Sequence, residues 1–124
     1  MSTSFLIFIG AGLGGVLRYW LSYVLHWSLH VHRFPYGTLA VNISGCFLMG
    51  VFATLSLNRH YGSAFRSFLL VGFLGGYTTF SAFSIETINL LENGAWLSAL
   101  INSVGSVLAC LTAAWIGIFL ARQL

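Results

Sequence analysis

The sequence has 124 residues, of which 58% are hydrophobic, 16% aromatic and only 6% charged, with a formal net charge of +3. A soluble domain usually carries roughly 25% charged residues, so seven charged side chains, five Arg and two Glu, cannot cover a water-exposed surface. This composition excludes a water-soluble enzyme, and its apolar, aromatic character excludes a disordered chain. It predicts an all-α membrane protein with a single domain over residues 1–124.

Four segments are long and apolar enough to cross a membrane. A helix needs about 20 apolar residues to span a hydrocarbon core of ~30 Å, and this length is available in residues 5–25, 36–57, 65–91 and 95–121. Four spans place both termini on one side, together with the connection around residues 58–62. We therefore expect a multi-pass protein surrounded by membrane lipids.

The arginines give only a small orientation bias. Arg59, Arg66 and Arg122 fall on the side of the termini, and Arg33 falls on the opposite side. Because Lys and Arg in short loops set orientation, two interpretations stay open: a weakly specified topology, or a chain that inserts in both orientations. The basic residues form no cluster, so no nucleic-acid partner is predicted.

The first span contains a Gly10-x-x-x-Gly14 pattern, and the third contains Gly72-x-x-x-Gly76. This spacing lets helix backbones approach closely, either within one chain or across a dimer. Four helices enclose little volume, which favours a homo-oligomer if the protein forms a pathway. Arg18 either extends to the interface or faces a cavity, where it would attract anions.

Asn42 is the strongly polar residue near the middle of the second span, beside Ser44 and Gly45. Polar side chains are costly inside a membrane. The amide must therefore bind a neighbouring helix or a solute.

The third span contains the most informative segment, residues 75–84, with the sequence Gly-Gly-Tyr-Thr-Thr-Phe-Ser-Ala-Phe-Ser. Glycines followed by β-branched and hydroxyl residues form poor helix. The segment predicts a helix broken at mid-membrane, whose freed carbonyls could bind a cation. A kinked but continuous helix is the alternative.

Phe80 and Phe83 are three residues apart and share a helix face. Such rings usually belong to a core or contact lipid, but the positive ring edge can also stabilise a small anion. In the fourth span, residues of one face recur every four positions: Ser98, Asn102, Ser106 and Cys110. They predict either hydrogen bonds between helices or a polar track for a solute.

No catalytic group can be assembled. Glu86 and Glu92 are the only acids, and they lie on one predicted helix. Cys46 and Cys110 lie in separate apolar segments without metal-ligand spacing, so each is predicted to be a small buried hydrophobe rather than a metal ligand or half of a disulfide. We expect no enzyme activity.

These motifs together resemble the Fluc (CrcB) family of small fluoride channels. The resemblance covers nearly the whole chain. It rests on Gly-Gly-x-x-Arg-Tyr in the first span, Gly37-Thr38-x-x-x-Asn42-x-x-Gly45 in the second, and Gly-Gly-x-Thr-Thr-Phe-Ser-x-Phe from Gly75 in the third.

The resemblance implies an antiparallel, dual-topology homodimer in the bacterial plasma (inner) membrane, with two fluoride pores. It also implies a structural sodium ion at the dimer centre, held by the backbone carbonyls of Gly75 and Thr78. The implied fluoride pathway consists of Asn42, Thr79, Phe80, Ser81, Phe83 and Ser106. Arg18 would lie toward a vestibule, with Thr38 and Glu86 near the other end of the ion path.

The sequence departs from the family pattern at three positions. Ala82 stands where Thr is common, so one hydroxyl beside the rings is missing. Cys110 stands where Thr often continues the polar track. Tyr77 replaces a more usual aliphatic residue, and we expect it to crowd the break.

Two other functions compete. A small four-helix proton-coupled exporter would need an acid in the first span, where Arg18 is the only charge. An assembly or anchoring subunit would use its glycines only for packing, and it would leave the converging polar groups unexplained.

Overall fold

The computed structural model describes residues 2–29, 34–59 and 61–124, and every regular element among them is helical. The elements in chain order are α1 (Thr3–Leu29), α2 (Tyr36–Asn58), α3 (Ser63–Phe65), η1 (Arg66–Leu74), α4 (Gly75–Tyr77), α5 (Phe80–Glu92), α6 (Trp96–Leu100), η2 (Ile101–Gly105) and α7 (Ser106–Ala121). The segments η1 and η2 are π-helical, with backbone hydrogen bonds that reach five residues rather than four. The predicted all-α class is confirmed.

Four helical segments are long and apolar enough to cross a membrane: Thr3–Ser28, Tyr36–Asn58, Ser63–Glu92 and Trp96–Ala121. The third is made of α3, η1, α4 and α5, and the fourth of α6, η2 and α7. The prediction of four spanning helices is confirmed. Arg33, which the sequence places on the side opposite the termini, lies outside the described residues.

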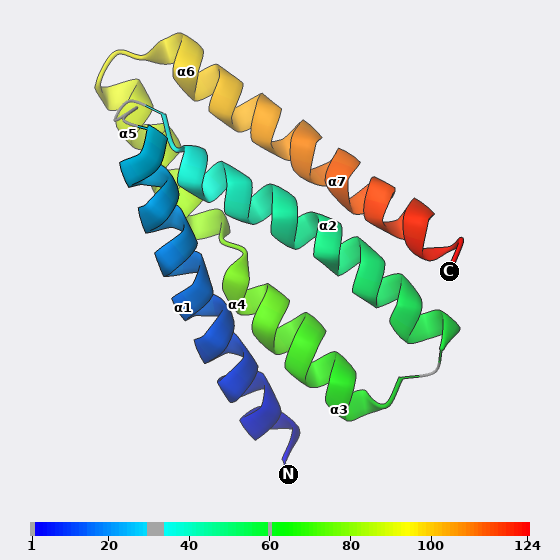
Figure 1. The fold of residues 1–124 in the computed structure, drawn as a ribbon. Coiled ribbons are helices and arrows are strands. Elements are labelled where there is room, and N and C mark those ends of the chain that lie inside the picture. Colours follow the sequence, from blue (N-terminus) through cyan, green and yellow to red (C-terminus); the bar gives the residue numbers. More distant parts are fainter. Residues whose placement is uncertain (1, 30–33, 60) are drawn as a thin grey trace.

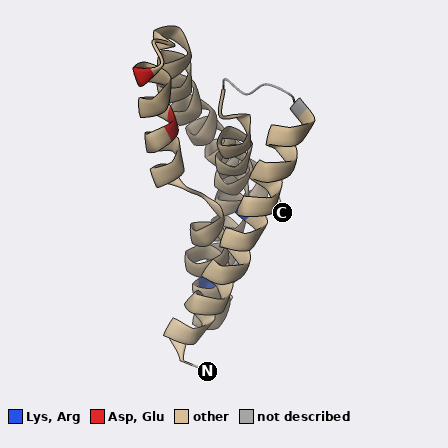
Figure 2. Ribbon diagram, turned by 90° about the vertical axis from the view of Figure 1, so that its left-hand side faces the viewer, with Lys and Arg blue, Asp and Glu red and all other residues tan. Residues whose placement is uncertain are grey.

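Both termini and the connection from α2 to α3 lie at one end of the molecule, and the connection from α5 to α6 lies at the other (Figure 1). A hydrogen bond of 3.3 Å from Arg59 Nη2 to the Leu124 carbonyl ties that first connection to the C-terminus. The two termini and this connection therefore share one end of the molecule, as four spans predict. Figure 2 shows both glutamates far from the N-terminal end.

The second and fourth spans run side by side in the same direction (Figure 1), and glycines let their backbones touch. A β-carbon on Gly50 would lie 3.1 Å from the Ile118 nitrogen, and one on Gly117 would lie 3.1 Å from the Val51 nitrogen. At this separation no side chain fits between the helices. The contact fixes the register of α2 against α7.

The glycine pairs of the first and third spans face each other within one chain. A β-carbon on Gly72 would lie 2.9 Å from the Ile7 carbonyl and 3.1 Å from Gly10 Cα. One on Gly76 would lie 2.8 Å from Ala11 Cα. Of the two interpretations of this spacing, packing within the chain is the one that the structure shows.

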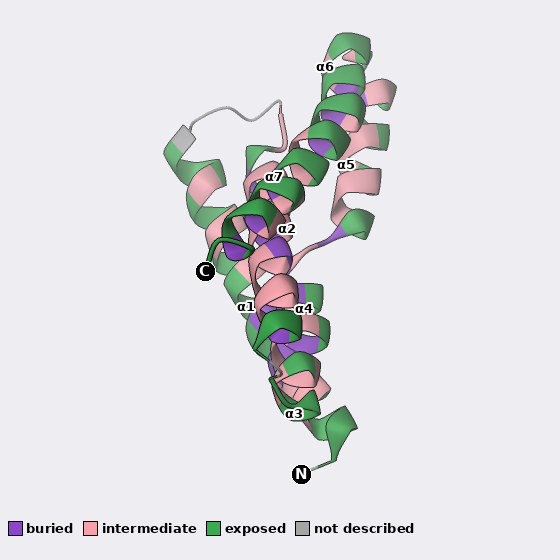
Figure 3. Cartoon of the chain, turned by 90° about the vertical axis from the view of Figure 1, so that its right-hand side faces the viewer, coloured by how far each residue is buried: buried purple, intermediate pink, exposed green. Residues whose placement is uncertain are grey.

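The buried hydrophobic core is small among the described residues, and Leu74 and Val41 are its largest fully buried members. Figure 3 shows buried positions where helices meet and exposed positions along their outer sides. Many large apolar side chains are exposed, including Trp20, Trp96 and Trp115. This is the pattern expected where lipid, rather than water, covers the surface.

The glycine contact predicts different effects for two substitutions in α1. Gly10→Ala places a methyl group 2.8 Å from the Phe73 nitrogen, and we expect the free energy of unfolding in detergent, followed by tryptophan fluorescence, to fall by about 1–3 kcal/mol. Gly12→Ala is the matched control, because a β-carbon there meets nothing within 4 Å. We expect it to leave stability unchanged or raise it by up to ~1 kcal/mol. Equal losses in both variants would contradict the packing argument.

Candidate functional site

The third span is not helical at Thr78 and Thr79, which lie within the segment where the sequence predicts a break. Thr78 has φ −78° and ψ 155°, and Thr79 has φ −148° and ψ 121°, so both are extended. The hydroxyls of these two residues form hydrogen bonds with the backbone of the helix ends on either side. Thr78 Oγ1 donates to the Leu74 carbonyl at 3.0 Å, and Thr79 Oγ1 accepts from the Ala82 N–H at 3.2 Å.

Asn42 of α2 binds the backbone at this interruption. Its Nδ2 donates to the Thr79 carbonyl at 2.9 Å, and its Oδ1 accepts from the Thr79 N–H at 2.8 Å. One side chain thus satisfies both polar groups of an extended residue within an apolar span. The Asn42 amide, which we expected to bind a neighbouring helix or a solute, binds the backbone of another span.

The interruption diverts two backbone N–H donors from the helical pattern. In a continuous α-helix the N–H of Thr79 would donate to the carbonyl of Gly75, and that of Ala82 to Thr78. Instead, the first donates to Asn42 and the second to the Thr79 hydroxyl. The Gly75 and Thr78 carbonyls, which the resemblance assigns to sodium, are therefore among the four that lose their helical donors, together with those of Gly76 and Tyr77 between them. Neutral oxygen ligands of this kind suit a hard cation.

We expected Tyr77 to crowd the break, but the structure shows that its ring has space. Its side chain is buried, and a β-carbon on Gly45 would lie only 3.0 Å from its Cδ1 atom, so the glycine makes room for the ring. The hydroxyl shares a hydrogen bond of 2.9 Å with Ser44 Oγ. Two residues that follow Asn42 closely in the sequence thus hold Tyr77 in place: Ser44 binds its hydroxyl, and Gly45 leaves space for its ring.

A first cavity of about 230 Å³ lies beside the interruption. The rings of Phe80 and Phe83 line it, 5.2 Å apart between centroids and tilted by 42°, and their predicted common face is confirmed. Phe80 is 75% exposed, so a single chain leaves this side of the cavity uncovered. The lining residues are Asn42, Cys46, Thr78, Thr79, Phe80, Phe83, Ser106, Val107 and Cys110.

Ser81 does not line the first cavity, but its hydroxyl shares a hydrogen bond of 3.2 Å with Thr79 Oγ1. Ser81 therefore contacts a residue that lines the cavity, Thr79, rather than the cavity itself. The cysteines, which the sequence treats as two separate hydrophobes, meet at this one cavity and are both free thiols.

A second cavity of about 430 Å³ brings together Arg18, Thr38 and Glu86. Thr38 Oγ1 donates to Glu86 Oε1 at 2.7 Å, and the buried Glu86 Oε2 has no hydrogen-bond partner among the described residues. The resemblance sets Arg18 apart from the other two along the path, but within one chain all three border the same cavity. Thr79 lines this cavity as well as the first.

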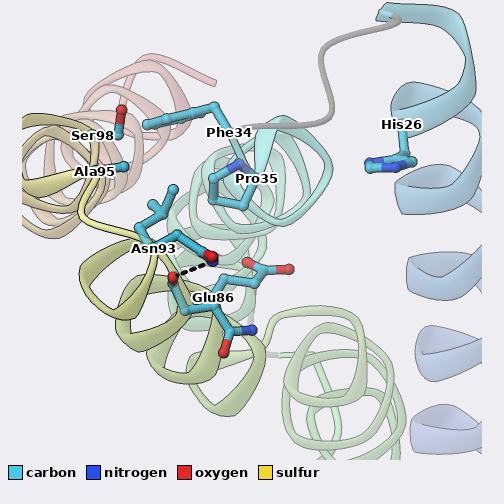
Figure 4. Close-up of a pocket in the computed structure, with 9 residues that line it drawn as sticks. His26, Phe34, Pro35, Glu86, Asn93, Ala95 and Ser98 are labelled. Carbon is cyan, nitrogen blue, oxygen red and sulfur yellow. Dashed lines mark hydrogen bonds between the residues drawn. The ribbon is translucent and has the colours of Figure 1, made fainter.

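A third cavity, of about 680 Å³, continues from Glu86 toward the connection between α5 and α6 (Figure 4). It is lined by His26, Phe34, Pro35, Glu86, Asn89, Leu90, Asn93, Ala95 and Ser98. Asn93 Nδ2 donates to the Asn89 carbonyl at 2.7 Å. Asn89 and Asn93 were not predicted from the sequence, although their spacing of four places both on one helix face.

The polar face of the fourth span makes a hydrogen bond to another span and also borders two of the cavities. Asn102 is 2% exposed and donates to Thr87 Oγ1 of α5 at 2.8 Å, which is a hydrogen bond between spans. Ser106 donates to Asn102 Oδ1 at 3.2 Å and also lines the first cavity. Cys110 lines that cavity too, and Ser98 lines the third.

The sequence is similar to known proteins over nearly its whole length. The family model described as "CrcB-like protein, Camphor Resistance (CrcB)" matches residues 5–118. A protein of Coxiella burnetii (strain Dugway 5J108-111) is 50% identical over 121 residues, which cover 96% of this chain and 97% of the relative. One of Paramagnetospirillum magneticum is 44% identical over 94% of this chain and 93% of its own length. Both are named "Fluoride-specific ion channel FluC".

The Asn42 contact predicts a local loss of stability. Asn42→Ala leaves the Thr79 N–H and carbonyl without these partners, and we expect the free energy of unfolding to fall by about 1–3 kcal/mol. Hydrogen–deuterium exchange at the Thr79 amide should become faster. Thr54→Val is the control on the same helix, because its hydroxyl donates only to the Gly50 carbonyl one turn away. Equal exchange at Thr79 in both variants would show that Asn42 does not hold the extended backbone.

Proposed function

Because the chain belongs to the CrcB family, we propose that it is a fluoride-selective ion channel through which fluoride passes the membrane passively and leaves the cell. Its similar relatives are bacterial proteins named as fluoride-specific channels, so it is a channel and not an enzyme. The four apolar spans make it a multi-pass protein of a bacterial membrane. The observation that carries the proposal is the first cavity, where hydroxyls and two phenylalanine rings surround the interruption of the third span.

Fluoride is small and strongly hydrated, so a pathway must offer donors in place of water without holding the ion too tightly. Phe80 and Phe83 offer ring edges of positive potential, and Thr79 has a hydroxyl proton free for the ion when Ser81 donates to it. The Ser106 hydroxyl also lines the cavity, but it would have to turn away from Asn102 Oδ1 to donate to the ion. An amide has two N–H donors, and the described contacts of Asn42 use one of them. Ser81 orients the Thr79 hydroxyl.

The three cavities suggest the course of the ion. Thr79 borders the first and second, and Glu86 borders the second and third. Arg18 lines the second, where its charge raises the local concentration of anions. In this proposal Arg18, Thr38 and Glu86 form the vestibule side of the path, and the phenylalanine rings form its narrow part.

The single chain supports an antiparallel homodimer with two pores. Phe80 lines the first cavity and is nevertheless 75% exposed, so the wall beside it is incomplete in one chain. A second copy would complete it. The small arginine bias fits subunits that insert in opposite orientations.

A structural sodium ion at the centre of that dimer would be held by the Gly75 and Thr78 carbonyls. The diverted N–H groups of Thr79 and Ala82 support this assignment. Backbone carbonyl oxygens are ligands that suit a hard cation such as sodium. Bound there, the ion would supply the charge that joins the carbonyl dipoles of two interrupted spans.

The phenylalanine rings predict a loss of fluoride flux on substitution. Phe80→Ile and Phe83→Ile remove the ring edges that would stabilise the ion in its passage. Because about 1.4 kcal/mol in the barrier corresponds to tenfold in rate, we expect each variant to lower the rate by up to roughly tenfold. Flux would be measured with a fluoride electrode as fluoride leaves potassium-loaded liposomes after valinomycin is added. Phe8→Ile, at an exposed ring of α1, is the control. Full flux in both ring variants would remove the rings from the pathway.

The proposed cation site predicts a specific effect of sodium. Replacing sodium with a large organic cation should slowly inactivate the channel and lower the midpoint of thermal unfolding, because a ligand at 100 times its Kd stabilises the folded state by ~2.7 kcal/mol. Returning sodium should restore both. Identical unfolding midpoints in the two solutions would refute the site, whatever the flux.

Dual topology predicts that a reporter fused after Leu124 faces both sides of the membrane. Cells carrying either a fluorescent reporter active only inside or a phosphatase active only outside should both give strong signals. Activity from one fusion alone would exclude an antiparallel dimer.

A further inference from the structure

Two cysteines lie side by side on neighbouring spans and are not used by the proposed function. Cys46 of α2 and Cys110 of α7 are free, half-buried thiols, and both line the same cavity from neighbouring helices. Four residues further along both helices, Gly50 meets Ala114 at backbone contact. The tight helix contact therefore holds the thiols together one turn away from it.

The cysteine pair also borders the candidate pathway. Both thiols line the first cavity, together with Asn42, Phe80 and Phe83. Anything bound between the sulfur atoms would occupy space beside the phenylalanine rings. The cavity, at about 230 Å³, has room for a single metal ion.

The two thiols restrict the kind of metal ion that this site can bind. No third His, Cys, Asp or Glu accompanies the pair in the described part of the chain, so a four-ligand zinc site of the structural kind does not form. Sulfur ligands select soft metal ions and not the hard cations bound by carbonyls. Two sulfur atoms without further ligands suit a thiophilic ion that binds two ligands, such as Hg²⁺.

We propose that Cys46 and Cys110 form a dithiol site for a thiophilic metal ion, and that an ion bound there obstructs the fluoride pathway. Each thiol loses its proton as its sulfur–metal bond forms, so two protons are released and no oxidant or reductant takes part. The obstruction rests on the proposed channel function, whereas the site itself does not.

Metal binding tests the site directly. The full-length protein in detergent would receive equimolar Hg²⁺ and then excess 2-mercaptoethanol, and intact-mass spectrometry would identify the adduct. We expect one bridging Hg²⁺ per chain with no mercaptoethanol attached, because the second thiol binds at a high effective concentration. Cys46→Ser and Cys110→Ser should each give only the mixed adduct, and Cys46→Ala and Cys110→Ala repeat the test if the serine variants fold poorly. A mixed adduct in the unsubstituted protein would overturn the site.

Fluoride flux tests the obstruction, with each sample compared with its own untreated flux. We expect Hg²⁺ to lower flux about tenfold in the unsubstituted protein, with recovery on adding a dithiol chelator, and single variants to need about tenfold more metal. Unchanged flux with the bridging adduct present would overturn the obstruction. Absence of flux before any metal is added would instead reject the channel function, while the mass measurement still decides the dithiol site.

Discussion

Two hydrogen bonds between the Asn42 side chain and the Thr79 backbone make an extended residue tolerable inside an apolar span. Without water, each unpaired backbone group in such a span costs several kcal/mol. The amide offers a donor and an acceptor, so it satisfies both groups at once. The cavity lining and the freed carbonyls of Gly75 and Thr78 both follow from this interruption, since it turns the chain between α4 and α5.

Glycines provide the second condition, because the spans must approach closely enough for one side chain to reach the next backbone. Gly10 and Gly72 bring α1 against η1, and Gly50 brings α2 against α7. Gly45 has a different task, since it leaves space for the Tyr77 ring. Small residues thus serve here in place of the hydrophobic effect, which gives no driving force between helices in lipid.

Much of the site could be anticipated because the relevant chemistry is local in sequence. Poor helix formers at residues 75–84 predicted the interruption, and the spacing of Phe80 and Phe83 predicted their shared face. The expectation that Tyr77 crowds the break was wrong, because the space for its ring comes from Gly45 on another span. The sequence did not predict Asn89 and Asn93, because a polar pair at a helix end is common and only the folded chain shows that a cavity lies beside it.

Composition and periodicity were enough for the membrane class, the number of spans and the side shared by the termini, because these follow from hydrophobic length and from counting. Contacts between residues distant in the chain needed the folded structure. Only there does Asn42 meet Thr79, does Arg18 border one cavity with Thr38 and Glu86, and do Cys46 and Cys110 become a pair. Sequence spacing determines which residues share a face of one helix, but the register between helices depends on backbone contacts at glycines.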